Sequence, residues 1–295
     1  TGANFVGSTI QAGSGNDTVT IGGNMSQGTG KKDAFIYLGD GNDSLNVTGT
    51  VENATVQTSG GNNYLDFDNT IAATNAGKSS VIAGSGNDSL NFDGAIVGAY
   101  VDAGGGADSI VMDESLAGST GAFTLKAGSG TDTLTLNSDN NVVDDAFIKV
   151  TDLETIVYAA TADGKTLTLG ANAQSAGVTT VKVTGAQADV TAAAYTSAVF
   201  LTAGTGATSH ITGGKGSDTL VGGAGTNTIT VTDGNDTLTG GGDVDTFTFN
   251  NTKAATYTIT DLGNGADVIE ASGVNATINA TVATAGGITL GNTNL

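Results

Sequence analysis

Residues 213 to 248 read GGKGSDTLV GGAGTNTIT VTDGNDTLT GGGDVDTFT, which is four nine-residue frames in direct succession. The sixth position of a frame is a short acidic or amide residue and the eighth is a large apolar one: Asp218, Asn227, Asp236 and Asp245, then Leu220, Ile229, Leu238 and Phe247. Such alternation begins a strand, and the inward face of each strand can stack on the same position of its neighbours. The segment therefore predicts stacked parallel strands joined by glycine turns.

The turns of these frames have the chemistry of a cation site. Paired glycines allow a positive φ and bring several carbonyl oxygens together without Cβ clashes, and a short carboxylate completes an oxygen cage. Such a cage suits a hard cation, because hard cations prefer oxygen ligands, and calcium is the ion of suitable size. We expect each ion to lie between the turns of adjacent coils, where it pairs Asp17 with Asp43, Asp88 with Asp108, Asp108 with Asp132, and Asp218 with Asp236.

The first half of the chain repeats the same turn at wider spacing. Six turns of the type GSGND end at Asp17, Asp43, Asn63, Asp88, Asp108 and Asp132, which are 26, 20, 25, 20 and 24 residues apart. Two and four residues beyond each of them stands an apolar residue: Val19/Ile21, Leu45/Val47, Leu65/Phe67, Leu90/Phe92, Ile110/Met112 and Leu134/Leu136. A fixed register over six turns favours a repeat architecture over ordinary hairpins.

One repeat of this length corresponds to one coil of a solenoid. We expect a strand before each turn, a strand after it, and looser return loops such as 49–53 and 94–98. The strands before the turns are predicted at Ala34–Leu38, Ala54–Thr58, Ser80–Ala83, Ala99–Asp102 and Ala122–Lys126. From Gly213 onward two nine-residue frames make one coil, so both edges carry turns. The predicted class is all-β, a right-handed parallel β-solenoid (β-roll or β-helix), because abundant Gly, Thr and Val disfavour helices.

The predicted organisation has four parts. Residues 1–141 form calcium-turn coils, residues 142–212 form ion-poor coils, residues 213–250 form the nine-residue β-roll, and residues 251–295 close the array. The second part carries apolar runs but no calcium turn: Phe147–Val150, Thr155–Tyr158, Thr166–Leu169, Val178–Val183 and Ala198–Leu201. A separate β-sandwich is the alternative there, and we prefer a continuous solenoid because no Pro/Ser linker intervenes. Thr1 does not resemble a natural start, so we expect a piece of a longer protein.

Composition narrows the setting. The formal net charge is −20, with 25 Asp against 4 Glu, and all nine basic residues are Lys. Such acidity argues against nucleic acid or an anionic membrane as partner. The chain contains no run of about 20 apolar residues, which is the length needed to span a membrane. The chain has no Cys and therefore no disulfide bonds. A long secreted protein of this sequence needs another source of stability, and bound calcium would supply it.

Catalysis is not expected. His210 is the only histidine, whereas a histidine-ligated metal site needs at least two. If Ser209 takes the sixth position of a defective frame, Ile211 faces the core and His210 points outward. The acidic pairs Asp66/Asp68, Asp144/Asp145 and Asp243/Asp245 could serve acid–base chemistry on a glycan. We interpret them instead as solvated or calcium-binding carboxylates, since Trp is absent and the aromatic residues are mostly in core register.

The frame G-G-x-G-x-D-x-U-x at 213–248, together with the GSGND turns, resembles the RTX (hemolysin-type calcium-binding) repeat family. The segment 257–273 (YTITDLGNGADVIEASG) resembles the closing strands that follow such arrays. The resemblance implies several bound Ca2+ ions and export through a type I secretion system. With its low Lys content, lack of Cys and richness in Thr, Ala, Gly and Asn, the chain is most similar to RTX-type surface-layer (S-layer) proteins.

The metal-ligating residues expected from these turns are Gly13, Gly15, Asp17, Gly39, Asp40, Gly41, Asp43, Gly61, Asn63, Gly84, Gly86, Asp88, Gly104, Gly106, Asp108, Gly128, Gly130, Asp132, Gly214, Gly216, Asp218, Gly223, Gly225, Asn227, Asp233, Asp236, Asp243 and Asp245. Asn63 and Asn227 should mark weaker or altered sites, because an amide supplies an oxygen but no charge.

The expected function is a structural building block of a calcium-dependent lattice at the cell surface, with copies of the same chain as partners. Cell-surface polysaccharide is a further expected partner, through a region outside this chain. Two alternatives remain open: the secretion and folding module of an RTX exoenzyme or toxin, and a calcium-dependent adhesin. RTX turns do not separate these roles.

Overall fold

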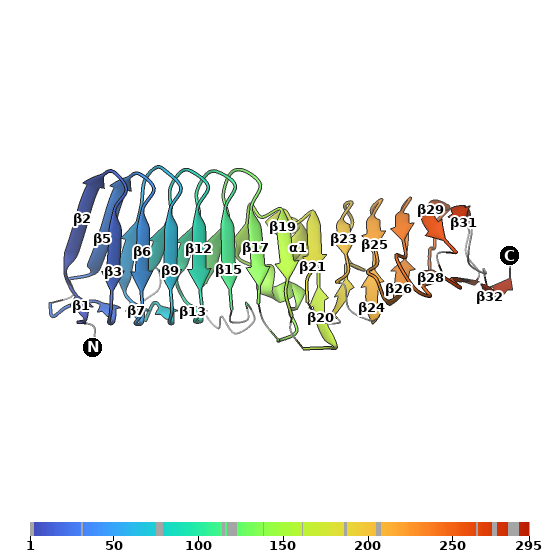
Figure 1. Cartoon of the computed structure of the whole chain (residues 1–295), viewed down its shortest axis with the longest axis horizontal. Coiled ribbons are helices and arrows are strands. Elements are labelled where there is room, and N and C mark those ends of the chain that lie inside the picture. The colour runs from blue at the N-terminus through green and yellow to red at the C-terminus, as the bar shows by residue number, and fades with distance from the viewer. Residues whose placement is uncertain are drawn as a thin grey trace. The chain divides into compact units, whose positions relative to one another are not determined.

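The computed structural model describes residues 3–30, 32–74, 79–113, 116, 123–137, 139–160, 162–185, 188–204, 208–263, 265–272, 276–282 and 289–294. Figure 1 shows the strands of the chain, which divides into two compact units. Unit 1 comprises residues 1–138 and 146–155, and unit 2 comprises residues 139–145 and 156–295. Each unit consists of parallel strands stacked coil upon coil, which confirms the all-β class and the parallel β-solenoid.

Unit 1 has three parallel sheets within the described residues. The first has the order β1 (Phe5–Val6), β4 (Met25–Ser26), β7 (Val51–Glu52), β10 (Ile71–Ala72) and β13 (Ile96–Val97). The second has the order β18 (Val150–Thr151), β16 (Thr124–Lys126), β14 (Tyr100–Asp102), β11 (Ser80–Ile82), β8 (Ala54–Gln57), β5 (Ala34–Asp40) and β2 (Thr9–Ser14). The third contains β3 (Thr18–Ile21), β6 (Ser44–Val47), β9 (Tyr64–Phe67), β12 (Ser89–Phe92), β15 (Ser109–Met112) and β17 (Thr133–Leu136).

Unit 2 has two main sheets within its described part. One contains β19 (Thr155–Tyr158, whose first residue belongs to unit 1), β21 (Thr180–Val183), β23 (Phe200–Thr202), β25 (Thr219–Val221), β27 (Thr237–Thr239), β29 (Ala255–Leu262) and β31 (Ala276–Val282). The other contains β20 (Lys165–Thr168), β22 (Ala188–Thr191), β24 (Thr208–Thr212), β26 (Thr226–Val231), β28 (Thr246–Phe249), β30 (Val268–Ser272) and β32 (Thr289–Asn294).

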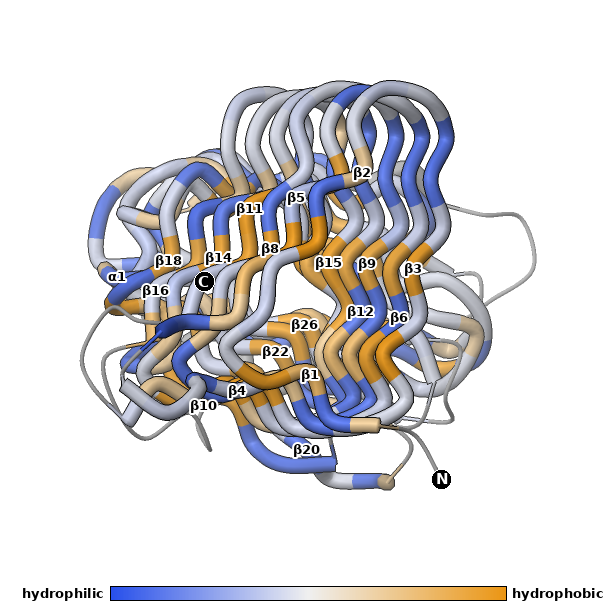
Figure 2. Tube along the Cα trace, turned by 90° about the vertical axis from the view of Figure 1, so that its left-hand side faces the viewer, coloured by the Kyte–Doolittle hydropathy of each residue, from blue (hydrophilic) through white to orange (hydrophobic). Residues whose placement is uncertain are grey.

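The core of unit 1 is built from the apolar positions that follow each turn. Leu45, Leu65, Leu90, Ile110 and Leu134 share one register column, and all are 0 % exposed. In the next inward column, the rings of Phe67 and Phe92 stack with centroids 5.4 Å apart. Alternating apolar and polar rows appear along β3, β6, β9, β12 and β15 in Figure 2. Of the twelve predicted core positions only Val19 is not fully buried, and it lies on β3, which has the single neighbour β6.

Two predictions on secondary structure are wrong. The return segments 49–53 and 94–98 are not loose loops, because each contains a strand of the first sheet, β7 or β13. Within residues 142–201 the run Phe147–Val150 is not one strand, because Phe147 ends a 3-10 helix (Asp144–Phe147) and only Val150 lies in a strand, β18. An α-helix, α1, spans Ala171–Ala176. The Asp144 carboxylate accepts the N–H groups of Gly170, Asn172 and Ala173, which favours helix α1 at a site where local propensity did not indicate it.

The other expected strands are found, with ends shifted by one or two residues. The strand predicted at Ala122–Lys126 begins at Thr124, and Ala122 lies outside the described residues. The boundaries of the four predicted parts stay predictions. The segment 257–273, expected to close the array, contributes to β29 and β30, which extend the two sheets of unit 2.

Candidate metal centre

The glycine turns of unit 1 stack directly on one another. The glycines at the first and third turn positions have φ between 90° and 143°, a region that favours glycine: Gly13, Gly15, Gly39, Gly41, Gly61, Gly84, Gly86, Gly104, Gly106, Gly128 and Gly130. A Cβ built on Gly130 would lie 1.6 Å from the carbonyl oxygen of Gly106. A Cβ on Gly41 would lie 2.1 Å from the oxygen of Gly15. The carbonyl oxygens of each turn therefore point along the stack onto the next glycine.

The sixth-position side chains form a hydrogen-bonded ladder along unit 1. Each Oδ1 accepts the backbone N–H of the equivalent residue in the preceding coil. The donor–acceptor pairs are Asp17 to Asp43 (2.9 Å), Asp43 to Asn63 (3.1 Å), Asn63 to Asp88 (2.7 Å), Asp88 to Asp108 (2.8 Å) and Asp108 to Asp132 (2.8 Å). The structure thus brings together the three pairs predicted in this unit, with one carboxylate oxygen already used.

The second carboxylate oxygen of these residues is buried without a hydrogen-bond partner. This holds for Oδ2 of Asp17, Asp43, Asp88, Asp108 and Asp132, and in unit 2 for Oδ2 of Asp236. A buried carboxylate oxygen with no donor costs free energy, unless a cation or a proton compensates it. The same unpartnered Oδ2 recurs from coil to coil, which indicates that each of these oxygens has the same kind of partner, a cation or a proton.

Without a bound cation, burial of most of these carboxyl groups raises their pKa values and so disfavours the ionised form. Burial raises the pKa of Asp108 and that of Asp236 to about 7, and it raises the pKa of Asp88 and that of Asp245 to about 6. Neighbouring carboxylates add to the effect at Asp108, where the charges of Asp132 and Asp88 raise the pKa further. A divalent cation would favour the ionised form of each group.

Unit 2 carries two such columns, one at each edge. At one edge the N–H of Val199 donates to Asp218 (3.0 Å), and the N–H of Asp218 donates to Asp236 (2.8 Å). At the other edge the N–H of Asn227 donates to Asp245 (2.7 Å). The predicted pair Asp218 and Asp236 is therefore adjacent, and both edges carry turns as expected.

The glycines of unit 2 differ from the expectation of a positive φ. Gly214, Gly216, Gly223 and Gly225 do not have left-handed backbone, whereas Gly234 and Gly241 do, with φ of 110° and 108°. Close packing explains two of the predicted glycines instead. A Cβ on Gly216 would lie 2.3 Å from the carbonyl of Ser197, and a Cβ on Gly214 would lie 2.7 Å from the oxygen of Tyr195.

Three predicted acidic ligands lie outside the ladders. Asp40 and Asp243 are exposed, and Asp243 has a φ of 60°. The carboxylate of Asp233 accepts the N–H groups of Thr252 (2.8 Å) and Lys253 (3.1 Å), and these hydrogen bonds lower its pKa. Asp233 thus anchors a neighbouring loop.

Sequence reasoning missed two members of the ladders. Glu154 accepts the N–H of Asp132 through Oε2 at 2.8 Å, so it takes the ladder position after Asp132 without a glycine turn. Asp267 accepts the N–H of Asp245 (2.9 Å) and that of Gly263 (2.6 Å). The signal for Asp267 was present in the sequence, because Gly263 and Gly265 precede it with the spacing of the earlier turns. No sequence signal marks Glu154.

The donor set fits calcium. Within the described residues no group of three or more His, Cys, Asp or Glu side chains is placed to hold a metal, so carboxylates alone cannot form a site. The turns offer backbone carbonyl oxygens directed along the stack, together with an unpartnered carboxylate oxygen at Asp17, Asp43, Asp88, Asp108, Asp132 and Asp236. Calcium accepts six to eight oxygen ligands of both kinds in flexible geometry. The residues that would hold it are the ladder aspartates and the turn glycines.

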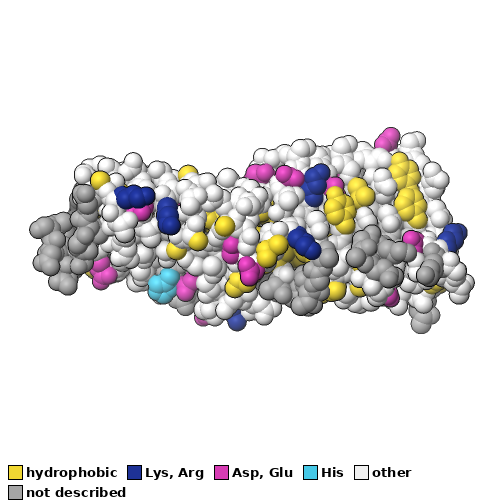
Figure 3. Space-filling view, turned by 180° about the vertical axis from the view of Figure 1, so that it is seen from behind, with side chains coloured by type: hydrophobic (Ala, Val, Ile, Leu, Met, Phe, Trp, Pro, Cys, Tyr) yellow, Lys and Arg dark blue, Asp and Glu magenta, His cyan; other side chains and the backbone are white. Residues whose placement is uncertain are grey.

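His210 is exposed, as predicted, with Ser209 and Ile211 buried on either side (Figure 3). Its Nδ1 lies 2.8 Å from Oδ1 of Asp189. Among the paired carboxylates, Asp66 and Asp68 accept the side-chain amide of Asn46 at 2.8 and 3.2 Å. Asp144 is occupied by the N–H groups at the start of α1.

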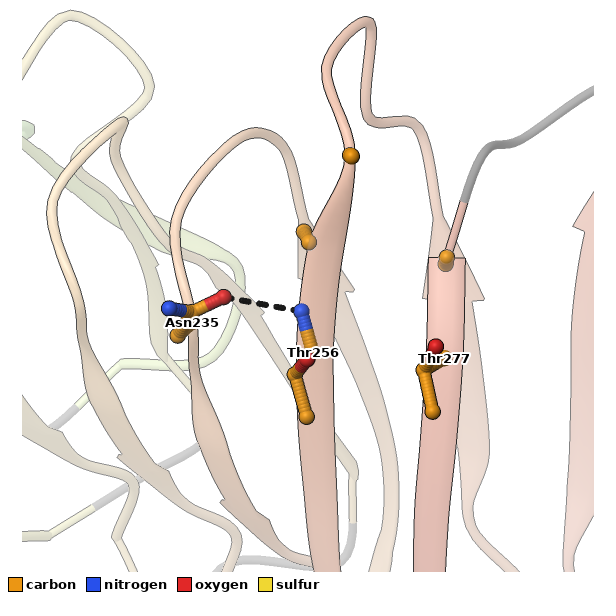
Figure 4. A pocket seen from close by; sticks show the side chains of 6 residues that line it. Asn235, Thr256 and Thr277 are labelled. Carbon is orange, nitrogen blue, oxygen red and sulfur yellow. Dashed lines mark hydrogen bonds between the residues drawn. The ribbon is translucent and has the colours of Figure 1, made fainter.

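A shallow pocket lies beside β29 and β31. Its lining is formed by Asn235, Ala254, Ala255, Thr256, Ala276 and Thr277 (Figure 4). Oδ1 of Asn235 accepts the N–H of Thr256 at 2.8 Å across it. This lining contains no titratable side chain, so it offers no group for acid–base chemistry.

Comparison with known families agrees with this geometry. The family model of the RTX calcium-binding nonapeptide repeat matches four times, at residues 8–23, 112–143, 203–238 and 212–247. No curated protein and no solved structure matches the chain significantly. No helix in the described part of the chain is long and apolar enough to cross a membrane. The matched segments contain Asp17, Asp132 and the ladder residues from Asp218 to Asp245, and they support an RTX-type, calcium-binding protein of the kind that is typically secreted.

Proposed function

We propose that this protein is a structural building block of a self-assembling, calcium-dependent surface layer, exported by a type I secretion system. The observation that carries the proposal is the recurrence of buried, unpartnered carboxylate oxygens from coil to coil in unit 1, with one further case at Asp236 in unit 2. Calcium bound at each junction would stiffen a unit along its whole stack. Stiffness of this kind suits a lattice component, and the proposed role includes no catalytic step.

The outer face of unit 1 provides a means of association. Asp68, Asp93 and Asp113 follow β9, β12 and β15 in register and are exposed. Adjacent parallel strands lie about 4.8 Å apart, so these carboxylates repel one another at a net charge of −20. Side-chain amides of Asn46, Asn91 and Asn137 donate to this row, at distances of 2.9 to 3.2 Å. Calcium bridges between two such rows would join copies of the chain.

The test is a calcium series followed by light scattering and negative-stain microscopy. We expect ordered assemblies at millimolar calcium that disperse on chelation. The triple variant Asp68→Asn, Asp93→Asn, Asp113→Asn should assemble poorly, whereas the charge-matched control Glu52→Gln, Asp189→Asn, Glu270→Gln should assemble normally. A protein that stays monodisperse at every calcium level would refute the lattice role and would favour a secretion module or an adhesin.

A further inference from the structure

Two ladder positions carry asparagine, and the side-chain nitrogens of both make equivalent contacts. Their oxygens differ, since Oδ1 of Asn63 accepts the N–H of Asp43 whereas Oδ1 of Asn227 is buried without a hydrogen-bond partner. Nδ2 of Asn63 donates to the carbonyl oxygen of Gly61 (3.0 Å), to that of Ala83 (3.2 Å) and to Oδ1 of Asp88 (2.9 Å). Nδ2 of Asn227 donates to the carbonyl oxygen of Gly225 (2.5 Å), to that of Gly240 (3.2 Å) and to Oδ1 of Asp245 (3.1 Å). In each case the acceptors belong to the turn of the asparagine and to the next coil.

The acceptors occupy equivalent positions in the two arrays. One is the carbonyl two residues before the asparagine, another is the carbonyl five residues before the next ladder aspartate, and the third is that aspartate. Asn63 is 2 % exposed and Asn227 is 0 % exposed, so water does not reach these contacts. Both side chains therefore place N–H donors inside a cage of three oxygens contributed by two coils.

Four aspartates of the unit 1 ladder present the opposite situation. An aspartate has a second oxygen where asparagine has Nδ2, and this Oδ2 is buried without a donor at Asp43, Asp88, Asp108 and Asp132. An oxygen in a cage of oxygens is repelled unless a cation lies among them. The amide nitrogen supplies through its hydrogens the positive partial charge that the ion supplies elsewhere.

We infer that Asn63 and Asn227 replace a calcium ion with their own side-chain amide, so that the coil junctions they span are held without metal. Each array thereby contains one junction independent of calcium, from Asn63 to Asp88 in unit 1 and from Asn227 to Asp245 in unit 2. The two junctions give the calcium-free chain a fixed point in each unit. This inference goes beyond the proposed role, and it holds whether or not the chain builds a lattice.

The experiment converts each asparagine into a calcium ligand. Calcium stoichiometry is measured by titration calorimetry on wild type, Asn63→Asp and Asn227→Asp, and folding is monitored by circular dichroism in calcium and after chelation. We expect each variant to bind one ion more per chain than wild type and to lose more structure than wild type on chelation. The control Asn62→Asp introduces the same charge one residue earlier, at an exposed residue whose Oδ1 accepts the N–H of Asn87, and it should gain no ion.

An unchanged stoichiometry in folded Asn63→Asp and Asn227→Asp would overturn the inference. If either variant fails to fold in calcium, the matching alanine variant decides. Asn63→Ala should bind as many ions as wild type and should be destabilised to the same extent with and without calcium. Loss of an ion in Asn63→Ala would show that the asparagine is a calcium ligand and not a substitute for the ion.

Discussion

Replacing Asp108 by asparagine should stabilise the calcium-free protein at pH 8. Asp108 is 2 % exposed, its Oδ1 accepts the N–H of Asp88, and its Oδ2 has no hydrogen-bond partner. Asparagine has the same shape, keeps an oxygen for the N–H of Asp88 and removes the buried negative charge. Substitution of a buried aspartate is ordinarily destabilising, so the expected sign distinguishes this explanation from a generic loss of packing.

The magnitude follows from the pKa of Asp108. Desolvation, followed by the charges of Asp132 and Asp88, raises this pKa from 3.8 to about 7. Because the folded state holds the proton more tightly, the stability from this group is complete below about pH 4 and is lost as pH rises towards 7. A difference of about three units at about 1.4 kcal/mol each sets an upper bound of roughly 4 kcal/mol at pH 8. Calcium should reverse the ranking, since asparagine removes a charged ligand.

The assay is urea unfolding followed by circular dichroism, on wild type and Asp108→Asn, in calcium-free buffer at pH 5 and pH 8 and in calcium at pH 8. In calcium-free buffer, wild type should be more stable at pH 5 than at pH 8, and the variant should change much less with pH. Asp33→Asn, at an exposed residue outside the ladder, serves as the control. The explanation is refuted if Asp108→Asn is less stable than wild type in calcium-free buffer at pH 8.

Three further predictions concern the turns and their ions. Gly106→Ala should destabilise by more than about 3 kcal/mol in a thermal melt, because its φ is 143° and its Cβ would lie 2.0 Å from the oxygen of Gly86. Gly105→Ala, whose φ is not left-handed, should lose far less, and equal losses would contradict the stacking argument. Asp236→Ala should remove one calcium ion in titration calorimetry while Asp233→Ala should not, and equal ion counts would exclude Asp236 as a ligand. Excess chelator should unfold much of the protein, because sites with a dissociation constant near 10⁻⁴ M each contribute about 1.4 kcal/mol at roughly 1 mM calcium; a β signal unchanged after proven calcium loss would refute this.

The repeat spacing predicted the ladder of unit 1, because the register between stacked parallel strands follows from the order of residues along the chain. Once Asp17, Asp43 and their successors align, parallel stacking must bring them together, and the structure shows each bonded to the next. Glu154 could not be found in this way. Three residues separate β18 from β19 at this point, against six between β16 and β17, and the longer glutamate side chain accepts the N–H of Asp132. Likewise α1 depends on the Asp144 carboxylate, which is 26 residues from Gly170 in the sequence. Helix propensity is judged from neighbouring residues and does not include so distant a contact.

The distinction between the ladder asparagines and aspartates was predictable only in part. An amide in place of a carboxylate indicated an altered site at Asn63 and Asn227, but the three acceptors around each Nδ2 come from two coils. The carbonyls of Ala83 and Gly240 belong to residues with no sequence signature. These carbonyls accept the amide because adjacent coils lie close together, and a sequence pattern does not give the distance between coils.

The contact of each turn with its neighbour also determines which changes of length the fold can accept. A glycine such as Gly130 fits because the oxygen of Gly106 leaves no room for a Cβ, so a residue inserted into one glycine turn would shift that turn against the glycine turn stacked on it. Coil lengths in unit 1 nevertheless vary from 20 to 26 residues, and that variation lies away from the turns. Such a chain can lengthen in evolution by duplicating a whole coil, since each new turn meets a surface identical to the one it copied. Single-residue insertions are then confined to the return side, where sequence can diverge without disturbing the stack.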